Sequence, residues 1–155
     1  MPNQTQPSKQ FEHQAWGLFK ISNSEEYQKR ISLDGIRFTL ILEAPTLNPN
    51  EVQQLLSQSG DRAAVCLQNF AERVEKCKAS IVKHLLQLAN EYRSSTNQIE
   101  LSREMFLSRI KLKNVSVHPS GGAFWFEDGN CFAGHGIVAS FGPLGGLRDK
   151  PYLVG

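Results

Sequence analysis

The feature that most constrains the fold is a long amphipathic segment in the middle of the chain. From Asp61 onward, apolar residues recur every three or four positions, which is the spacing of one face of an α-helix. A helix of about nine turns with a continuous apolar stripe must bury that stripe. We therefore expect it to pack on a β-sheet. The stripe consists of Leu67, Phe70, Val74, Cys77, Ile81, Leu85, Leu88 and Tyr92.

The residues before this helix alternate between apolar and polar types, as β-strands do. Strands are predicted at 15–21, 28–33 and 36–43. Asp34-Gly35 lies between the second and third strands, and this dipeptide is typical of a hairpin turn. The pattern indicates an antiparallel meander with one face buried.

Two shorter helices are predicted around the long one. Asn48 can cap the first, because Pro49 suits the first helical position and Glu51 follows three residues after the cap. Ser59-Gly60 is expected to end that helix. The second is predicted from Ser102 through Ile110.

The last third of the chain returns to strand patterns. Val115 and Val117 mark one strand, and a short final strand is expected at 152–154. Between them, the stretch 123–138 reads A-F-W-F-E-D-G-N-C-F-A-G-H-G-I-V. Asp128-Gly129 predicts a tight hairpin between its two apolar runs, and the returning strand is expected to carry Cys131, Phe132 and Ala133, then Ile137 and Val138.

This order of elements predicts an α+β fold. We expect an antiparallel sheet, formed by the N-terminal β-meander and the C-terminal β-hairpin strands, packed against one long amphipathic helix and two short helices. Residues 1–10 are polar and contain two prolines, so they are expected to form a disordered N-terminal tail. Residues 11–155 are expected to form a single domain.

Composition narrows the possible partners. Seventeen basic and fifteen acidic side chains are spread evenly along the chain, which disfavours nucleic acid as a partner. The chain contains no apolar run of about 20 residues and no signal sequence, so we expect a cytoplasmic protein without membrane contact. Cys66, Cys77 and Cys131 lie far apart among apolar residues and are expected to be reduced and buried.

Few residues suggest catalysis. Asp128 and His135, with Glu127 beside them, form an acid-histidine group that is close in sequence, and glycines flank the histidine. They could form a small enzyme or ligand-binding site in which His135 acts as a base or metal ligand. Equally, Asp128 suits a turn and His135 could bond to a backbone carbonyl. The sequence lacks metal-ligand spacings and phosphate loops, so we predict no catalytic residue, no metal and no cofactor.

The C-terminal third resembles a family of bacterial domains of unknown function. The matching segments are 101–112, 115–138 and 145–149, and the most specific part is D-G-x-x-F-x-G-H-x-I at Asp128 to Ile137. The resemblance implies an α+β fold and a bacterial protein. Related domains resemble immunity proteins that accompany secreted polymorphic toxins, although a shared fold does not determine a shared function.

Two kinds of function follow from these observations. The first is a non-enzymatic binding protein, specifically an immunity protein that binds and neutralises a cognate toxin as a monomer or weak homodimer. The second is the small enzyme or ligand-binding protein around Asp128 and His135. The candidate partner-binding residues of the first are Trp16, Trp125, Glu127, Asp128 and Arg148.

Overall fold

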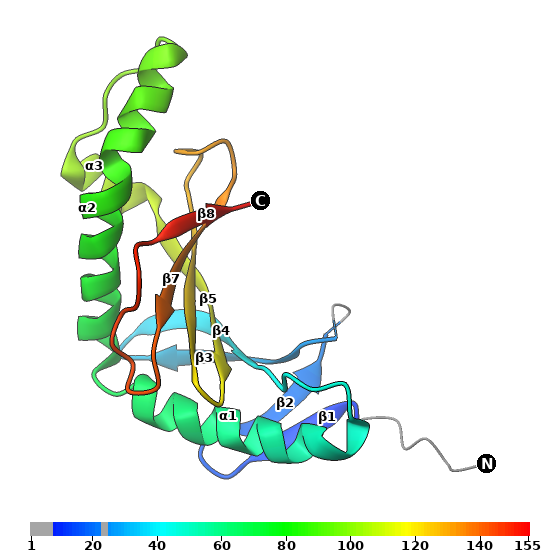
Figure 1. Ribbon diagram of the computed structural model, residues 1–155. Coiled ribbons are helices and arrows are strands. Elements are labelled where there is room, and N and C mark those ends of the chain that lie inside the picture. Colours follow the sequence, from blue (N-terminus) through cyan, green and yellow to red (C-terminus); the bar gives the residue numbers. More distant parts are fainter. Residues whose placement is uncertain (1–7, 23–24) are drawn as a thin grey trace.

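The fold is built on one curved sheet of eight strands, whose order in the sheet is the order in the chain. The structure is a computed structural model that describes residues 8–22 and 25–155 (Figure 1). Six of the seven strand pairs are antiparallel, and β4 pairs with β5 in parallel. The strands are β1 (Gln10–His13), β2 (Gly17–Ile21), β3 (Tyr27–Leu33), β4 (Ile36–Leu42), β5 (Lys111–His118), β6 (Gly121–Glu127), β7 (Gly136–Phe141) and β8 (Tyr152–Val154).

All the helices found in the described residues lie between β4 and β5. They are the 3-10 turn η1 (Pro49–Glu51), α1 (Val52–Cys66), the 26-residue α2 (Phe70–Ser95) and α3 (Arg103–Arg109). A parallel strand pair needs a long connection of this kind, because the chain must return to the end of the sheet where the first strand began before the next strand can start. The predicted α+β fold, with a sheet packed against one long helix and two shorter ones, is therefore confirmed.

The core lies on one side of the sheet. Alternate residues of the strands, among them Phe38, Leu40 and Val115, are fully buried and belong to the same apolar cluster as the helix stripe. Leu56 of α1 and Ile81 of α2 are members of that cluster as well, so both helices cover the same sheet face (Figure 1). We call the opposite side the outer face; no helix in the described part of the chain covers it.

A chain of aromatic rings joins the long helix to the sheet. The ring of Phe70, the first residue of α2, stacks on Phe38 of β4 with their centroids 4.6 Å apart. Phe70 also meets Phe124 of β6 at 6.2 Å, and Phe124 meets Phe141 of β7 at 5.1 Å. These contacts tie both halves of the sheet to the start of α2.

The boundary between the first two helices differs from the prediction. Helix α1 does not end at Ser59-Gly60 but runs on to Cys66, and the break comes at Asn69, whose φ is 53°. Gly60 is tolerated inside the helix because its missing side chain lets the β1–β2 hairpin approach. The predicted long helix is thus divided: its start at Asp61 belongs to α1, Leu67 lies between the helices, and the rest of the stripe lies on α2.

The N-terminal strands also differ from the prediction. The predicted strand at 15–21 is β2, which begins at Gly17, and a further strand, β1, precedes it. Gln10, expected in the tail, begins β1 opposite Lys20. The rest of that predicted tail through residue 7 lies outside the described residues.

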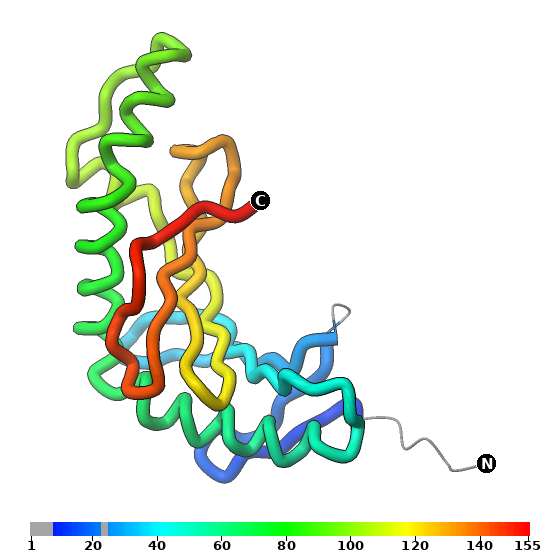
Figure 2. Tube along the Cα trace, in the orientation of Figure 1, coloured from blue at the N-terminus to red at the C-terminus, as the bar shows by residue number. Residues whose placement is uncertain are grey.

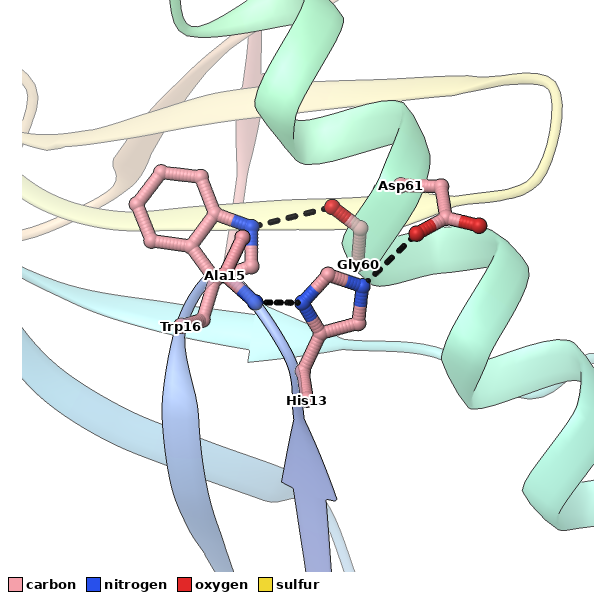
Figure 3. A network of polar contacts seen from close by, with 5 residues as sticks. All are labelled: His13, Ala15, Trp16, Gly60 and Asp61. Atoms are coloured by element: carbon pink, nitrogen blue, oxygen red, sulfur yellow. Dashed lines mark hydrogen bonds and ion pairs between the residues drawn. The ribbon is translucent and has the colours of Figure 1, made fainter.

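Polar contacts fasten the β1–β2 hairpin to α1 (Figure 3). His13 Nδ1 accepts the backbone N–H of Ala15 at 3.0 Å, so the proton lies on Nε2, which donates to Asp61 Oδ1 at 2.8 Å. Trp16 Nε1 donates to the carbonyl of Gly60 at 2.9 Å. Because His13 is buried and both its nitrogens are engaged, the ring has little freedom to move.

We expect Gly60→Ala to destabilise the protein. An added Cβ would lie 2.2 Å from His13 Cδ2, and this overlap should outweigh the gain of about 1 kcal/mol that alanine brings to a helix interior. Urea unfolding should show a net loss of about 1–2 kcal/mol. Gly146→Ala is the matched control, since nothing lies within 4 Å of its added Cβ. Equal stability of the two variants would contradict the packing described here.

The three cysteines are free and buried, as predicted. Burial raises the pKa of the Cys77 thiol from 9.0 to about 12, although the guanidinium of Arg73 opposes the shift. An unfolded chain loses this proton near pH 9 whereas the folded chain keeps it, so stability that is fully present below pH 9 is lost between pH 9 and about 12.

The free energy of unfolding should therefore fall with rising pH in this range, by up to about 1.4 kcal/mol per pH unit from Cys77. Urea unfolding of Cys77→Ala at a series of pH values provides the comparison. The variant should be less stable near neutral pH but should show a shallower alkaline decline. Parallel pH profiles would show that Cys77 does not contribute.

Candidate functional site

The segment after β6 is a structured loop and not the predicted tight hairpin. Residues 128–135 separate β6 from β7, and the predicted returning strand starts only at Gly136. Cys131, Phe132 and Ala133, expected in that strand, belong to the loop. Cys131 and Phe132 are buried in the main core, and this burial draws the chain away from a direct turn.

Asp128 organises this loop. Its carboxylate accepts three backbone N–H groups: Asn130 on Oδ1 at 3.0 Å, and Phe132 and Gly134 on Oδ2 at 2.8 and 2.9 Å. Ala133 has φ of 56°, a conformation that a residue with a side chain adopts at a cost. The buried carboxylate therefore compensates for an otherwise strained backbone.

His135 closes the same loop. Its Nδ1 donates to the carbonyl of Phe132 at 2.5 Å, so Nε2 is the acceptor nitrogen when the ring is neutral. The side chain is exposed and lies beside the C-terminal residue Gly155, and Figure 2 shows β8 passing next to the loop. No hydrogen bond links His135 to Asp128 among the described residues, so the acid does not orient the imidazole.

A hollow of about 510 Å³ lies beside the loop. Trp125, Glu127, Asp128 and His135 all line it, so the structure brings together three of the five predicted binding residues and the histidine. Glu127 is exposed, whereas Asp128 is 5% exposed and already holds the loop. Of these lining side chains, Asp128 and His135 are hydrogen-bonded to the backbone of the loop.

The two other predicted binding residues lie elsewhere. Trp16 is half-buried and bonded to α1, and Arg148 is exposed next to Gly142, at the opposite end of β7 from the hollow. The five candidates therefore do not share one surface. Close spacing in sequence was sufficient to group Trp125 with Asp128, but it gave no guide to Trp16 or Arg148.

The outer face carries a feature that the local sequence did not reveal. Strand register places six residues in one row across the sheet, from β3 to β8. Trp125 lies near the centre, and its indole Nε1 donates to Ser116 Oγ at 2.9 Å. Val138 is fully buried although no described helix covers this face. The row consists of Arg30, Thr39, Asn114, Trp125, Val138 and Tyr152.

Within residues 8–22 and 25–155, no group of three or more His, Cys, Asp or Glu side chains could hold a metal ion. Burial raises the pKa of the Cys131 thiol in the loop, while Arg109 opposes the shift, so this thiol stays protonated at neutral pH. None of the helices described is long and apolar enough to cross a membrane.

The fold defines a small α+β protein whose sheet has helices on one face and a bare second face. The chain belongs to a bacterial family described as "Uncharacterized protein conserved in bacteria (DUF2262)", whose model matches residues 13–150. The expected membership of a bacterial family of unknown function is thereby confirmed. No curated protein and no solved structure matches the chain. The hairpin signature and the relation to immunity proteins stay predictions.

Replacing Asp128 tests its structural role. Asp128→Ala removes the acceptor of three backbone N–H groups, and we expect a loss of about 2 kcal/mol in urea unfolding, together with faster amide hydrogen exchange at Phe132 and Gly134. Glu127→Gln changes the neighbouring exposed carboxylate and should stay within about 0.5 kcal/mol of the unmodified protein. Unchanged stability of the Asp128 variant would show that the fold does not need this carboxylate, which would leave it available for a functional role.

Proposed function

We propose that this protein is a non-enzymatic binding protein, and specifically an immunity protein that neutralises a cognate secreted toxin by direct contact. The observation that carries the proposal is that no described helix covers the outer face of the sheet. Its apolar centre contains Trp125 and Val138, yet no described helix covers it. A large aromatic residue held in a fixed orientation, with polar groups around it, is typical of protein–protein interfaces.

Trp125 is suited to this role because its position is fixed before binding. The bond from the indole to Ser116 restricts the ring, so little conformational entropy remains to be lost when a partner arrives. Tyr152 lies in the same row and is 48% exposed. Trp125 thus offers a half-buried, fixed aromatic group, and Tyr152 offers an exposed one on the same face.

The alternative function, a small enzyme or ligand-binding protein, would use the hollow around Asp128 and His135. The exposed Nε2 of His135 favours it, since an unprotonated nitrogen can accept a proton or bind a ligand. The hydrogen bonds of both side chains weigh against this alternative. Asp128 is engaged by three backbone groups and His135 by a carbonyl, so neither side chain is positioned by the other.

The proposal is tested by co-expressing the full chain with the product of the neighbouring gene and measuring both co-purification and protection from toxicity. Tyr152→Ala should weaken a toxin complex at least about fivefold, because truncating a hot-spot aromatic at an interface costs more than about 1 kcal/mol. Calorimetry on the purified complex measures the change.

Tyr92→Ala is the matched control. Tyr92 is 43% exposed, close to the value for Tyr152, but it lies on α2, away from the outer face. We expect the control to bind as tightly as the unmodified protein. If no toxin is bound or neutralised, the immunity function is wrong; if both tyrosine variants lose affinity alike, the interface does not lie on the outer face.

A further inference from the structure

We infer that the part of the outer face formed by β2, β3 and β4 recognises an acidic protein surface. This inference deepens the proposed function and rests on it, since it assigns the chemistry of the partner. The basis is a group of exposed cations, Lys20, Arg30 and Arg37, that strand alternation places together on the outer face.

The register shows how these cations come together. Lys20 of β2 lies opposite Gln28, Arg30 of β3 lies opposite Thr39, and Arg37 of β4 lies opposite Ser32. Gln28, Arg30 and Ser32 alternate along β3, so all three pairs project from one side. The set therefore combines three positive charges with neutral amide and hydroxyl groups that can hydrogen-bond to carboxylates.

These charges are not neutralised within the protein. None of the three cations forms an ion pair with any residue in the described ranges. Two hollows, of about 450 and 290 Å³, share Arg30 in their walls, and neither is lined by a carboxylate. Farther across the sheet, a cation does lie opposite an anion, because Lys111 pairs with Glu127 in register. Lys20, Arg30 and Arg37 are therefore three cations on β2–β4 that form no ion pair with any described residue.

The neighbouring residues favour a protein over a nucleic acid. Arginine, tryptophan and tyrosine are the residues most enriched at interface hot spots, and the row contains Arg30, Trp125 and Tyr152. A single-stranded nucleic acid instead needs exposed aromatic faces for successive bases. Trp125 is half-buried and tied to Ser116, which leaves Tyr152 as the exposed aromatic of the row.

The dimensions also suit a protein partner. From β3 to β8 the row crosses five strand spacings, or about 24 Å. A standard interface covers about 800 Å² on each partner, a patch roughly 30 Å across. A partner centred on Trp125 would thus reach Arg30 at one end of the row and Tyr152 at the other.

The experiment uses the full, isotope-labelled chain and two anionic probes of equal charge: a short poly-glutamate peptide and a single-stranded oligothymidylate. At low ionic strength, poly-glutamate should shift the NMR signals of Arg30, Arg37 and the Trp125 indole. The double variant Arg30→Glu with Arg37→Glu should weaken this binding at least about tenfold. Lys83→Glu with Arg103→Glu, on exposed positions of α2 and α3, makes the same change in net charge and should alter affinity less than about twofold.

Several results would overturn the inference. These are poly-glutamate shifts that leave Arg30 and Arg37 unaffected, equal losses in the two double variants, or tighter binding of oligothymidylate to the same residues, which would assign the surface to nucleic acid. If the charge reversal disturbs folding, Arg30→Gln with Arg37→Gln takes its place. A toxin that Arg30→Glu with Arg37→Glu still neutralises in full would refute this inference and leave the immunity function intact. If poly-glutamate binds as expected but no toxin partner is found, the immunity function is refuted and the inference that this face binds acidic surfaces stands.

Discussion

The packing of Phe70 against the sheet is the contact on which the rest of the structure depends. The first turn of α2 places this ring on Phe38 of β4 and beside Phe124 of β6, on either side of the parallel β4–β5 junction. Parallel pairing cannot be made by a local turn, so the two halves of the sheet must be joined by tertiary contacts. Burying one aromatic ring between them orients the long helix and aligns the two halves at the same time.

A core on one side of the sheet determines what the other side can do. The helices supply apolar partners for alternate strand residues, while the intervening residues have no second layer within the described chain. Such a face needs to be polar, self-covering or matched to a partner. Here the residues at the centre cover one another, since Trp125 lies between Asn114 and Val138 in register. The β2–β4 side carries polar and cationic side chains. The same alternation that builds the core therefore also creates the surface.

Local patterns predicted most elements but not their boundaries where distant groups intervene. The strand at Ile36 and the helix at Arg103 follow from alternation and from the Ser102 cap. Gly60 suggested a helix end, yet its lack of a side chain serves the approach of His13 from β1. Asp128-Gly129 suggested a two-residue turn, yet the carboxylate binds backbone groups up to six residues ahead. In both cases a tertiary contact outweighed the local preference of the residue.

The candidate site was predictable in chemistry and not in arrangement. Sequence proximity linked Trp125, Asp128 and His135, and these residues do line one hollow. The outer row could not be found in this way, because its members come from β3 to β8 and depend on the register of five strand pairs. Likewise, a net charge of +2 spread evenly along the chain conceals the grouping of Lys20, Arg30 and Arg37. Cations at alternate strand positions become neighbours only when β2, β3 and β4 pair, so the binding chemistry of this protein arises from its topology.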